Sequence, residues 1–227
     1  MFKVVVDETP LIEEELSYHK ITVATVRGRP YYNITCALRL MELQFDSLSP
    51  EEAAVSNAKV IITTQDEAGI VNKKGIVMID TELEKYPAIA KAKILRSIMG
   101  ERVIDDQLII GIDPGSRIGI SAIYLHHEIS SAVIESSLLD AINHVAAILG
   151  GIESRKKVVK IGDGNITMAM QIAHKLKMKF KDSVSIEIVD EHGTSLPQYA
   201  EANRRGIRDK SSARVIAFRS GKNFTLK

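Results

Sequence analysis

The sequence of 227 residues contains a single cysteine, Cys36, and no tryptophan. One thiol excludes an internal disulfide framework and a zinc site built from several cysteines, and it favours a reducing compartment. Aromatic residues make up only 5% of the chain, so stacking on aromatic rings cannot be the main means of holding bases or sugars. If the protein binds nucleic acid, electrostatic attraction must supply most of the affinity.

Long apolar runs are also missing. The uninterrupted apolar stretches are all shorter than the roughly 18 residues needed to cross a bilayer. The first residues, MFKVVVDETP, reach acidic side chains too early for a signal peptide. We therefore expect a cytoplasmic protein that does not associate with membranes. With 45% hydrophobic and 26% charged residues, the composition is that of an ordinary folded protein, and two small domains are the starting expectation.

The charge is unevenly distributed along the chain. Residues 1–106 contain 13 Lys and Arg against 17 Asp and Glu, a net charge of −4. Residues 107–227 contain 17 against 12, a net charge of +5. A basic surface concentrates polyanions around it. The asymmetry therefore predicts different partners for the two halves, with chance variation of the surface as the alternative.

The first half alternates strand-like and helix-like segments, which predicts a small α/β domain over residues 1–105. Ser49, Pro50 and Glu52 carry the signature of a helix start with a capping box. The expected strands are residues 21–26, 60–64 and 75–80, and helices are expected around residues 34–43 and over residues 81–99.

The strand ends of this first half carry polar side chains at positions where α/β folds often bind ligands. They are Thr63, Thr64, Asp66 and Asp80. The position in the fold is weak evidence, so a role as scaffold or as an oligomer surface is the favoured interpretation.

The pattern restarts after residue 106 and predicts a second domain over residues 106–227. Its order is three strands, helix, strand, helix, strand and two helices. The strands are expected over residues 108–112, 118–125, 131–135, 157–161 and 184–189, and the helices over residues 138–149, 166–176, 195–205 and 210–219.

Acidic residues stand at several strand ends of this second domain. Asp113 ends the most apolar strand, where an ionised carboxylate is costly unless a cation, a donor or solvent meets it. Asp163 follows the fourth strand, Glu191 follows the last strand, and Asp209 heads the final helix. In one sheet these ends can meet, and hard divalent cations bound by oxygen ligands relieve the repulsion of crowded carboxylates. The alternatives remain open that these residues only start turns, cap a helix or lie in solvent.

Three motifs carry a family resemblance. Gly111-Ile112-Asp113-Pro114-Gly115, followed by Gly119, resembles the first motif of RuvC-type Holliday junction resolvases. Residues 189–195 (VDEHGTS) are similar to the Asp-Glu-Arg-x-Thr/Ser motif of the YqgF group, and residues 209–216 (DKSSARVI) to that group's final Asp and aliphatic helix. The resemblance covers about residues 107–220. It implies a ribonuclease H-like α/β domain, a mixed five-stranded sheet with helices on both faces, preceded by the smaller α/β domain.

The resemblance implies catalytic and metal-binding roles for Asp113, Asp163, Glu191 and Asp209, of which Asp163 takes the fourth-strand position where RuvC-type enzymes place an acid. Mg²⁺ or Mn²⁺ is the implied cofactor. Successive side chains of a strand point to opposite faces, so we select Glu191 over the adjacent Asp190 as the ligand. Asp190 and His192 are candidates for auxiliary roles. His192 stands where the YqgF pattern has Arg.

Basic residues near these acids are candidate phosphate contacts, which position a nucleic acid without reading its sequence. Those before Asp163 and around Asp209 are Lys156, Lys157, Lys160, Arg204, Arg205, Arg208, Lys210 and Arg214. The sequence thus predicts a metal-dependent, structure-selective endonuclease that acts on branched DNA or structured RNA. A catalytically inactive nucleic-acid or protein binding platform and an actin-like or sugar-kinase-type nucleotide binder are the alternatives, and the resemblance also allows a homodimer.

Overall fold

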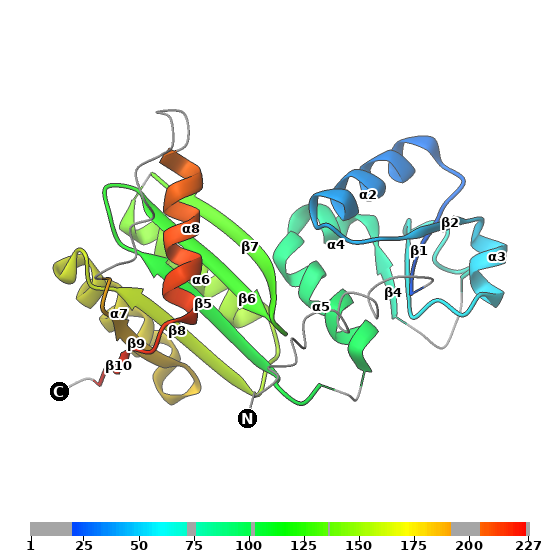
Figure 1. The fold of residues 1–227 in the computed structure, drawn as a ribbon. Helices are drawn as coiled ribbons and strands as arrows, with labels where there is room; N and C mark the ends of the chain where they lie inside the picture. The colour runs from blue at the N-terminus through cyan, green and yellow to red at the C-terminus, as the bar shows by residue number, and fades with distance from the viewer. Residues whose placement is uncertain (1–19, 72–75, 101–102, 136, 192–204, 226–227) are drawn as a thin grey trace, which may run out of the picture. The chain divides into compact units, whose positions relative to one another are not determined.

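A computed structural model describes residues 20–71, 76–100, 103–135, 137–191 and 205–225, without the side chains of residues 205–208. The chain divides into two compact units, Met1–Arg102 and Val103–Lys227, which we describe one at a time (Figure 1). Each unit packs helices on a sheet, so the α/β class expected from the sequence is confirmed. Within the described ranges, none of the helices is long and apolar enough to cross a membrane.

The first unit is built on a four-stranded parallel sheet with the order β2-β1-β3-β4. Its strands are β1 (Ile21–Ala24), β2 (Asp46–Leu48), β3 (Val60–Thr63) and β4 (Ile76–Ile79). β1 and β3 are buried along their whole length, as the continuous apolar sequences of central parallel strands predict. β2 has no such signal, because its sequence is only Asp-Ser-Leu.

Four helices of this unit lie within the described ranges: α2 (Gly28–Leu40), α3 (Pro50–Val55), α4 (Asp80–Lys85) and α5 (Pro87–Met99). α3 begins with the predicted capping box, in which Ser49 and Glu52 exchange side-chain and backbone hydrogen bonds of 3.2 and 2.9 Å. The prediction of a single helix over residues 81–99 is wrong, because α4 ends at Lys85 and α5 begins at Pro87, with the nonhelical Tyr86 between them. Pro87 disfavours helical backbone in the residue before it and lacks the N–H that a continuous helix would need.

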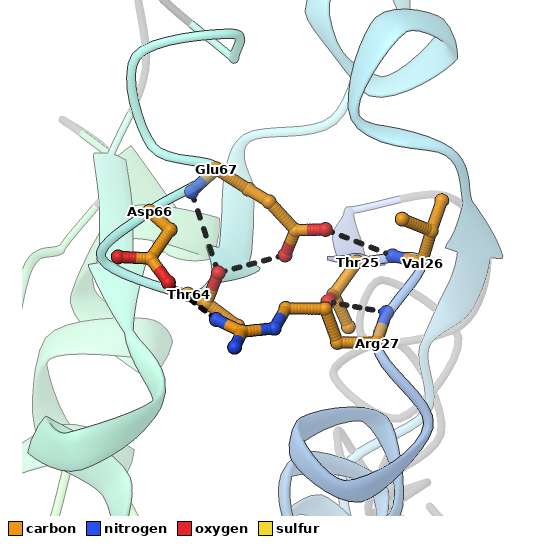
Figure 2. Close-up of polar contacts among 6 residues, drawn as sticks. All are labelled: Thr25, Val26, Arg27, Thr64, Asp66 and Glu67. Atoms are coloured by element: carbon orange, nitrogen blue, oxygen red, sulfur yellow. Dashed lines mark hydrogen bonds and ion pairs between the residues drawn. The ribbon is translucent and has the colours of Figure 1, made fainter.

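A network of polar groups joins the carboxyl ends of β1 and β3 (Figure 2). Glu67, only 7% exposed, accepts hydrogen bonds from the N–H of Val26 (3.0 Å) and the hydroxyl of Thr64 (2.7 Å). Arg27 forms an ion pair with Asp66 beside it. Burial raises the pKa of Glu67, but its hydrogen bonds and the positive charge of Arg27 lower that pKa by more, so the group stays ionised.

The polar residues suggested by the sequence for a ligand at these strand ends have partners inside the unit. Thr63 donates to the carbonyl of Ala24 (2.6 Å), and Asp80 accepts from the N–H of Thr81 (3.0 Å). Thr64 and Asp66 belong to the network of Figure 2. The contacts of Thr63 and Asp66 join the end of β1 to the end of β3 and the chain that follows it, whereas the contact of Asp80 is local.

The second unit contains a mixed sheet with the order β10-β9-β8-β5-β6-β7. β5, β6 and β7 are antiparallel neighbours, while β8 runs parallel to β5 and β9 parallel to β8. The strands are β5 (Gln107–Asp113), β6 (Ile118–Tyr124), β7 (His127–Ile134), β8 (Lys156–Gly162), β9 (Ser185–Val189) and β10 (Lys222–Asn223). The five predicted strands are thus present, and β10 adds a two-residue antiparallel edge strand that carries no apolar signal.

The β6–β7 hairpin corrects one predicted strand boundary. β7 begins at His127, whereas the sequence pattern places its start at Ser131. The turn consists of Leu125 and His126, both with positive φ (49° and 66°). Two-residue hairpin turns of this kind usually contain Gly or Asn, so the sequence gives no turn signal here.

Helices cover both faces of this sheet, as the resemblance implies. α8 (Arg205–Phe218) lies against β5 and β6, and α6 (Leu138–Gly151) and α7 (Ile166–Phe180) lie on the opposite face (Figure 1). Asn165 caps α7 as predicted, by accepting from the N–H of Met168 (3.1 Å), and a short 3-10 helix, η2 (Lys181–Ser183), follows α7. α8 begins earlier than the predicted residue 210, and most of the helix expected over residues 195–205 lies outside the described residues.

The polar network of Figure 2 predicts a stability effect. Glu67→Gln should lower the free energy of unfolding of the first unit at neutral pH by roughly 1–3 kcal/mol, because an amide nitrogen then replaces one of two buried accepting oxygens. Folding lowers the pKa of Glu67, so the ionised carboxylate stabilises the folded state. This stabilisation is present in full above the ordinary carboxyl pKa, and it is lost as the pH falls through the lowered pKa.

Urea unfolding at two pH values measures this effect. Glu82→Gln, which removes an exposed ion pair with Lys93, is the matched control and should change stability by no more than about 0.5 kcal/mol. Equal stability of the two variants at neutral pH would contradict a structural role for Glu67.

Candidate functional site

Three of the four predicted acids stand at one edge of the second sheet. β5, β8 and β9 are parallel, so their carboxyl ends meet at the same edge. Asp113 is the last residue of β5, while Asp163 directly follows β8 and Glu191 closely follows β9. The fourth acid, Asp209, reaches this edge from α8, where its backbone carbonyl lies against Gly119 of β6.

The pKa of the Asp113 carboxyl is raised by two features of this edge. Burial raises the pKa of its carboxyl, and the negative charge of Asp209 raises it further. A hydrogen bond with the side chain of Ser212, one turn after Asp209 on α8, lowers the pKa but does not offset the other two effects. The end of β5 and the start of α8 therefore share one electrostatic environment.

Glu191 extends this environment across the sheet edge. Its pKa is raised first by burial and then by the negative charges of Asp113 and Asp163, while a hydrogen bond from the backbone N–H of Gly164 lowers it. The carboxylates are thus linked in the order Asp209, Asp113, Glu191 and Asp163 by repulsion between neighbours. Shifts of this kind concentrate at functional sites.

Asp163 has a structural contact that the sequence does not reveal. Its carboxylate accepts a hydrogen bond from the backbone N–H of Glu191 (3.0 Å), and its own N–H donates to the carbonyl of Val189 (3.0 Å). This pair of bonds fixes the chain after β9 to the chain after β8. Asp163 therefore positions Glu191 as well as adding negative charge beside it.

The glycines around Asp163 make room for Glu191. A Cβ atom at position 162 would lie 1.8 Å from Oε1 of Glu191, and one at position 164 would lie 2.4 Å from its Oε2. Because both distances are far below van der Waals contact, Gly162 and Gly164 form a cradle that a side chain would fill. The sequence predicts a close approach at these glycines, and the approaching group is the Glu191 carboxylate.

Two other glycines allow α8 to lie with its backbone directly on the sheet. A Cβ at Gly111 would lie 2.0 Å from the carbonyl oxygen of Ala213, and a Cβ at Gly119 would lie 2.2 Å from the carbonyl oxygen of Asp209. Backbone atoms cannot move aside as the end of a side chain can. The glycines of the first motif thus set the position of Asp209.

Arg117 is a site residue that sequence reasoning missed. It lies in the β5–β6 turn, and its guanidinium Nη2 is 2.7 Å from Oδ2 of Asp209, while Nη1 is 3.5 Å from Oε1 of Glu135. The signal that could have revealed it is its position in the same turn as Asp113, four residues later in the sequence. A basic side chain in the β5–β6 turn is close enough to pair with an acid of the cluster, as Arg117 does with Asp209.

Two of the three predicted phosphate contacts on β8 lie away from the acids. Lys156 and Lys157 begin β8, whose seven residues place them at the opposite edge of the sheet, about 20 Å from Asp163. The ammonium group of Lys157 donates to the carbonyl of Leu149 (2.7 Å). The ammonium group of Lys160 donates to the carbonyl of Arg219 (2.6 Å). Their roles in binding nucleic acid stay predictions.

The remaining candidates lie on or near α8. Lys210 is exposed beside Asp209, and Arg214 approaches Glu128 at 3.7 Å. Asp190 is exposed, and its backbone carbonyl accepts from Arg219 (3.1 Å). Two predicted residues, His192 and Arg204, lie outside the described residues, and the side chains of two others, Arg205 and Arg208, are not described.

The donor chemistry of the site fits a hard divalent cation, since it consists of carboxylate oxygens. Oδ2 of Asp209 is buried and makes no well-aligned hydrogen bond within the described residues, although Arg117 is close enough for an ion pair. The described His, Cys, Asp and Glu residues nevertheless do not gather in threes closely enough to hold a metal ion. Charge repulsion acts over longer distances than coordination, so a metal would require these carboxylates to converge.

Comparisons with known proteins leave the family open. Neither a family model nor a curated protein matches the sequence. Among solved structures, the one described as "Crystal structure of Aa-Ago with externally-bound siRNA" has a TM-score of 0.27 and 12% sequence identity to this chain. The match covers 75% of this chain and 34% of that chain, so this chain spans about a third of that protein's length. A likeness at this level carries no argument about fold or function.

The contact between Gly119 and Asp209 predicts that Gly119→Ala will destabilise the second unit. We expect a loss of roughly 1–3 kcal/mol or more, because the new methyl group must displace the backbone of α8. Gly150→Ala is the control, since a Cβ at Gly150 has open space within 4 Å and alanine is a better helix former than glycine. Chemical unfolding of both variants tests the contact, and an unchanged Gly119→Ala protein would refute it.

The raised pKa of Asp113 predicts a stabilising substitution. Asp113→Asn should raise the melting temperature at neutral pH by about 2–4 °C, the shift that ~1 kcal/mol produces in a chain of this size. Because folding raises the pKa of Asp113, ionisation of this carboxyl destabilises the folded protein as the pH rises. The higher melting temperature of Asp113→Asn should therefore disappear in acid, where the wild-type carboxyl is protonated.

Asp182→Asn, at a fully exposed carboxylate, serves as the control and should leave the melting temperature unchanged. Thermal unfolding followed by circular dichroism over a pH series measures both variants. A lower melting temperature for Asp113→Asn at neutral pH would contradict the repulsion assigned to this site.

Proposed function

We propose that residues 103–227 hydrolyse phosphodiester bonds of nucleic acids with the help of divalent cations. The observation that carries this proposal is the electrostatic linkage of Asp113, Asp163, Glu191 and Asp209 at one sheet edge, where burial and mutual repulsion raise the pKa values of two carboxyls. Functional sites are where such shifts concentrate. The net charge of +5 over residues 107–227 supports a polyanionic substrate.

In this proposal each acid has a distinct task. Asp113, Glu191 and Asp209 would hold Mg²⁺ or Mn²⁺, and Asp163 orients Glu191 through the backbone hydrogen bond. A pair of such ions, when bound, would supply an activated water and stabilise the leaving oxygen of an in-line displacement. Lys210 and Arg214 extend along α8 from Asp209 and hold phosphates next to the cut. Branched DNA or structured RNA is the substrate class that the motif resemblance favours.

A second candidate function is a binding platform without catalysis. Two observations favour it: the described acids do not form a ready coordination set, and Arg117 already neutralises Asp209. The nucleotide-binder alternative receives less support. It requires two ribonuclease H-like halves, and the first unit has an all-parallel sheet without antiparallel strands among its described residues.

Cleavage assays test the nuclease proposal. The full chain should cut at least one of a panel of labelled junction, flap, duplex and RNA substrates in the presence of Mg²⁺ or Mn²⁺, and Asp113→Asn should lose this activity by at least about 100-fold. Asp182→Asn has the same change of charge at a fully exposed position and should cut normally.

Two outcomes would reject the nuclease proposal. One is cleavage by Asp113→Asn at the wild-type rate, which would place the activity elsewhere. The other is binding of these substrates by the wild-type chain without any cation-dependent cleavage, which is the behaviour of a platform.

A further inference from the structure

The negative charge of the first unit is unevenly spread along the chain. Residues 20–41 contain four Lys and Arg and no Asp or Glu, whereas the rest of residues 1–106 contains 9 Lys and Arg against 17 Asp and Glu. The acid-free stretch comprises β1, the turn after it and α2. A net charge of +4 is therefore concentrated on one strand and one helix of an otherwise acidic unit.

Two of these four basic side chains lie on the solvent side of α2. Ile34 and Leu38 face the interior of the unit and are no more than 1% exposed. Because an α-helix repeats every 3.6 residues, the side chains opposite them share one outer face. This outer face of α2 carries Arg29, Tyr32, Cys36, Arg39 and Leu40.

Tyr32 stands between the two arginines of this face. It is 67% exposed, which makes it the most exposed aromatic residue in the described part of the chain. Arg29 lies one turn before it and Arg39 two turns after it, so both are neighbours of the ring along the helix. At a rise of 1.5 Å per residue, the two arginines are about 15 Å apart along the helix axis. The face thus offers a cation, an aromatic ring and a second cation in a row.

The two arginines are exposed and form no ion pair with the described residues. Two acids border the face but have other partners. Asp66 is paired with Arg27, just before α2 (Figure 2). Glu84, on α4, accepts from the side-chain amide of Asn33 at 2.9 Å. Unpaired positive charge on the outer face is therefore available to a polyanion.

We propose that the outer face of α2 binds single-stranded nucleic acid. Arg29 and Arg39 contact phosphates of the strand, and an unpaired base stacks on the ring of Tyr32 between them. A duplex fits less well because its bases stack on one another and leave no free face for the ring. An acidic peptide would pair with the arginines without using the ring.

This site is independent of the cleavage proposed for the second unit. It uses no residue of the acidic cluster and needs no metal ion. It gives the first unit a function of its own, namely to hold an unpaired strand.

Anisotropy of a labelled oligothymidylate of about 16 nucleotides measures the binding, with the full chain and EDTA present. Arg29→Ala and Arg39→Ala should each weaken binding and lower the slope of log affinity against log salt concentration by about 0.7, the value for one phosphate contact of a single strand. Tyr32→Ala should weaken binding at least about fivefold and leave that slope unchanged, because stacking releases no counterions.

Lys93→Ala is the control for the arginine variants. It removes the same charge from a side chain of α5 that is 54% exposed and pairs with Glu82. Both the affinity and the salt slope should stay at their wild-type values. A salt slope that is unchanged in both arginine variants would contradict the phosphate contacts.

The absence of tryptophan from the sequence permits a local readout of stacking. Tyr32→Trp places a single tryptophan at the proposed site, and bound oligothymidylate should quench its fluorescence. Inorganic polyphosphate, which has the charge but no bases, should not.

Val55→Trp is the matched control, at a position that is 86% exposed at the end of α3. β2 and β3 lie on opposite sides of β1, so right-handed crossovers place α2 and α3 on opposite faces of the sheet. The fluorescence of Val55→Trp should therefore not change.

Three results would overturn the site. One is no quenching of Tyr32→Trp once anisotropy shows the oligothymidylate to be bound, since this readout is not masked by binding elsewhere on the chain. Another is equal quenching of Val55→Trp. The third is displacement of the oligonucleotide from Tyr32→Trp by polyglutamate at equal charge concentration, which would assign the face to acidic protein segments.

The outcome is separable from that of the nuclease proposal. Cleavage that depends on Asp113 stands even if Tyr32→Trp shows no quenching. Conversely, a chain that cuts none of the tested substrates can still hold a single strand on α2.

Discussion

The close packing of α8 on β5 and β6 is the constraint on which the site depends. Gly111 and Gly119 allow the helix backbone to approach to distances that a side chain would prevent, and this approach brings Asp209 to the sheet edge occupied by Asp113. β10 follows α8 and pairs with β9, so the helix is held at its far end as well. A shift of α8 would therefore change the charge distribution of the whole acidic cluster.

The cluster itself stores unfavourable energy. Asp113 and Glu191 are partly buried and repel their neighbours, which is the opposite of what stability alone would select. Two local devices oppose this repulsion: the hydrogen bonds of Asp163 between the ends of β8 and β9, and the pairing of Arg117 with Asp209. The site is thus held together by its backbone contacts and by one cation, while its carboxylates oppose one another.

The sequence predicts most of this fold because apolar runs and cap residues are local signals. It places the five main strands of the second sheet, the capping box at Ser49 and the cap at Asn165. It fails where the signal is nonlocal or absent: the left-handed turn at Leu125 and His126 lacks Gly, and the edge strand β10 lacks apolar residues. The candidate acids could be chosen from strand ends, whereas the turn that holds Arg117 gives only its proximity to Asp113, because its partners Glu135, just after β7, and Asp209, on α8, are distant in the sequence.

The late position of Asp209 has a consequence for the chain during its synthesis. Proteins emerge from the ribosome with their N-terminal parts first, so β5 to β9 leave it before α8 does. Until α8 packs onto β5 and β6, a nascent or prematurely terminated chain carries Asp113 and Glu191 without their fourth partner. Any activity that requires Asp209 is therefore withheld until translation of the domain is almost finished.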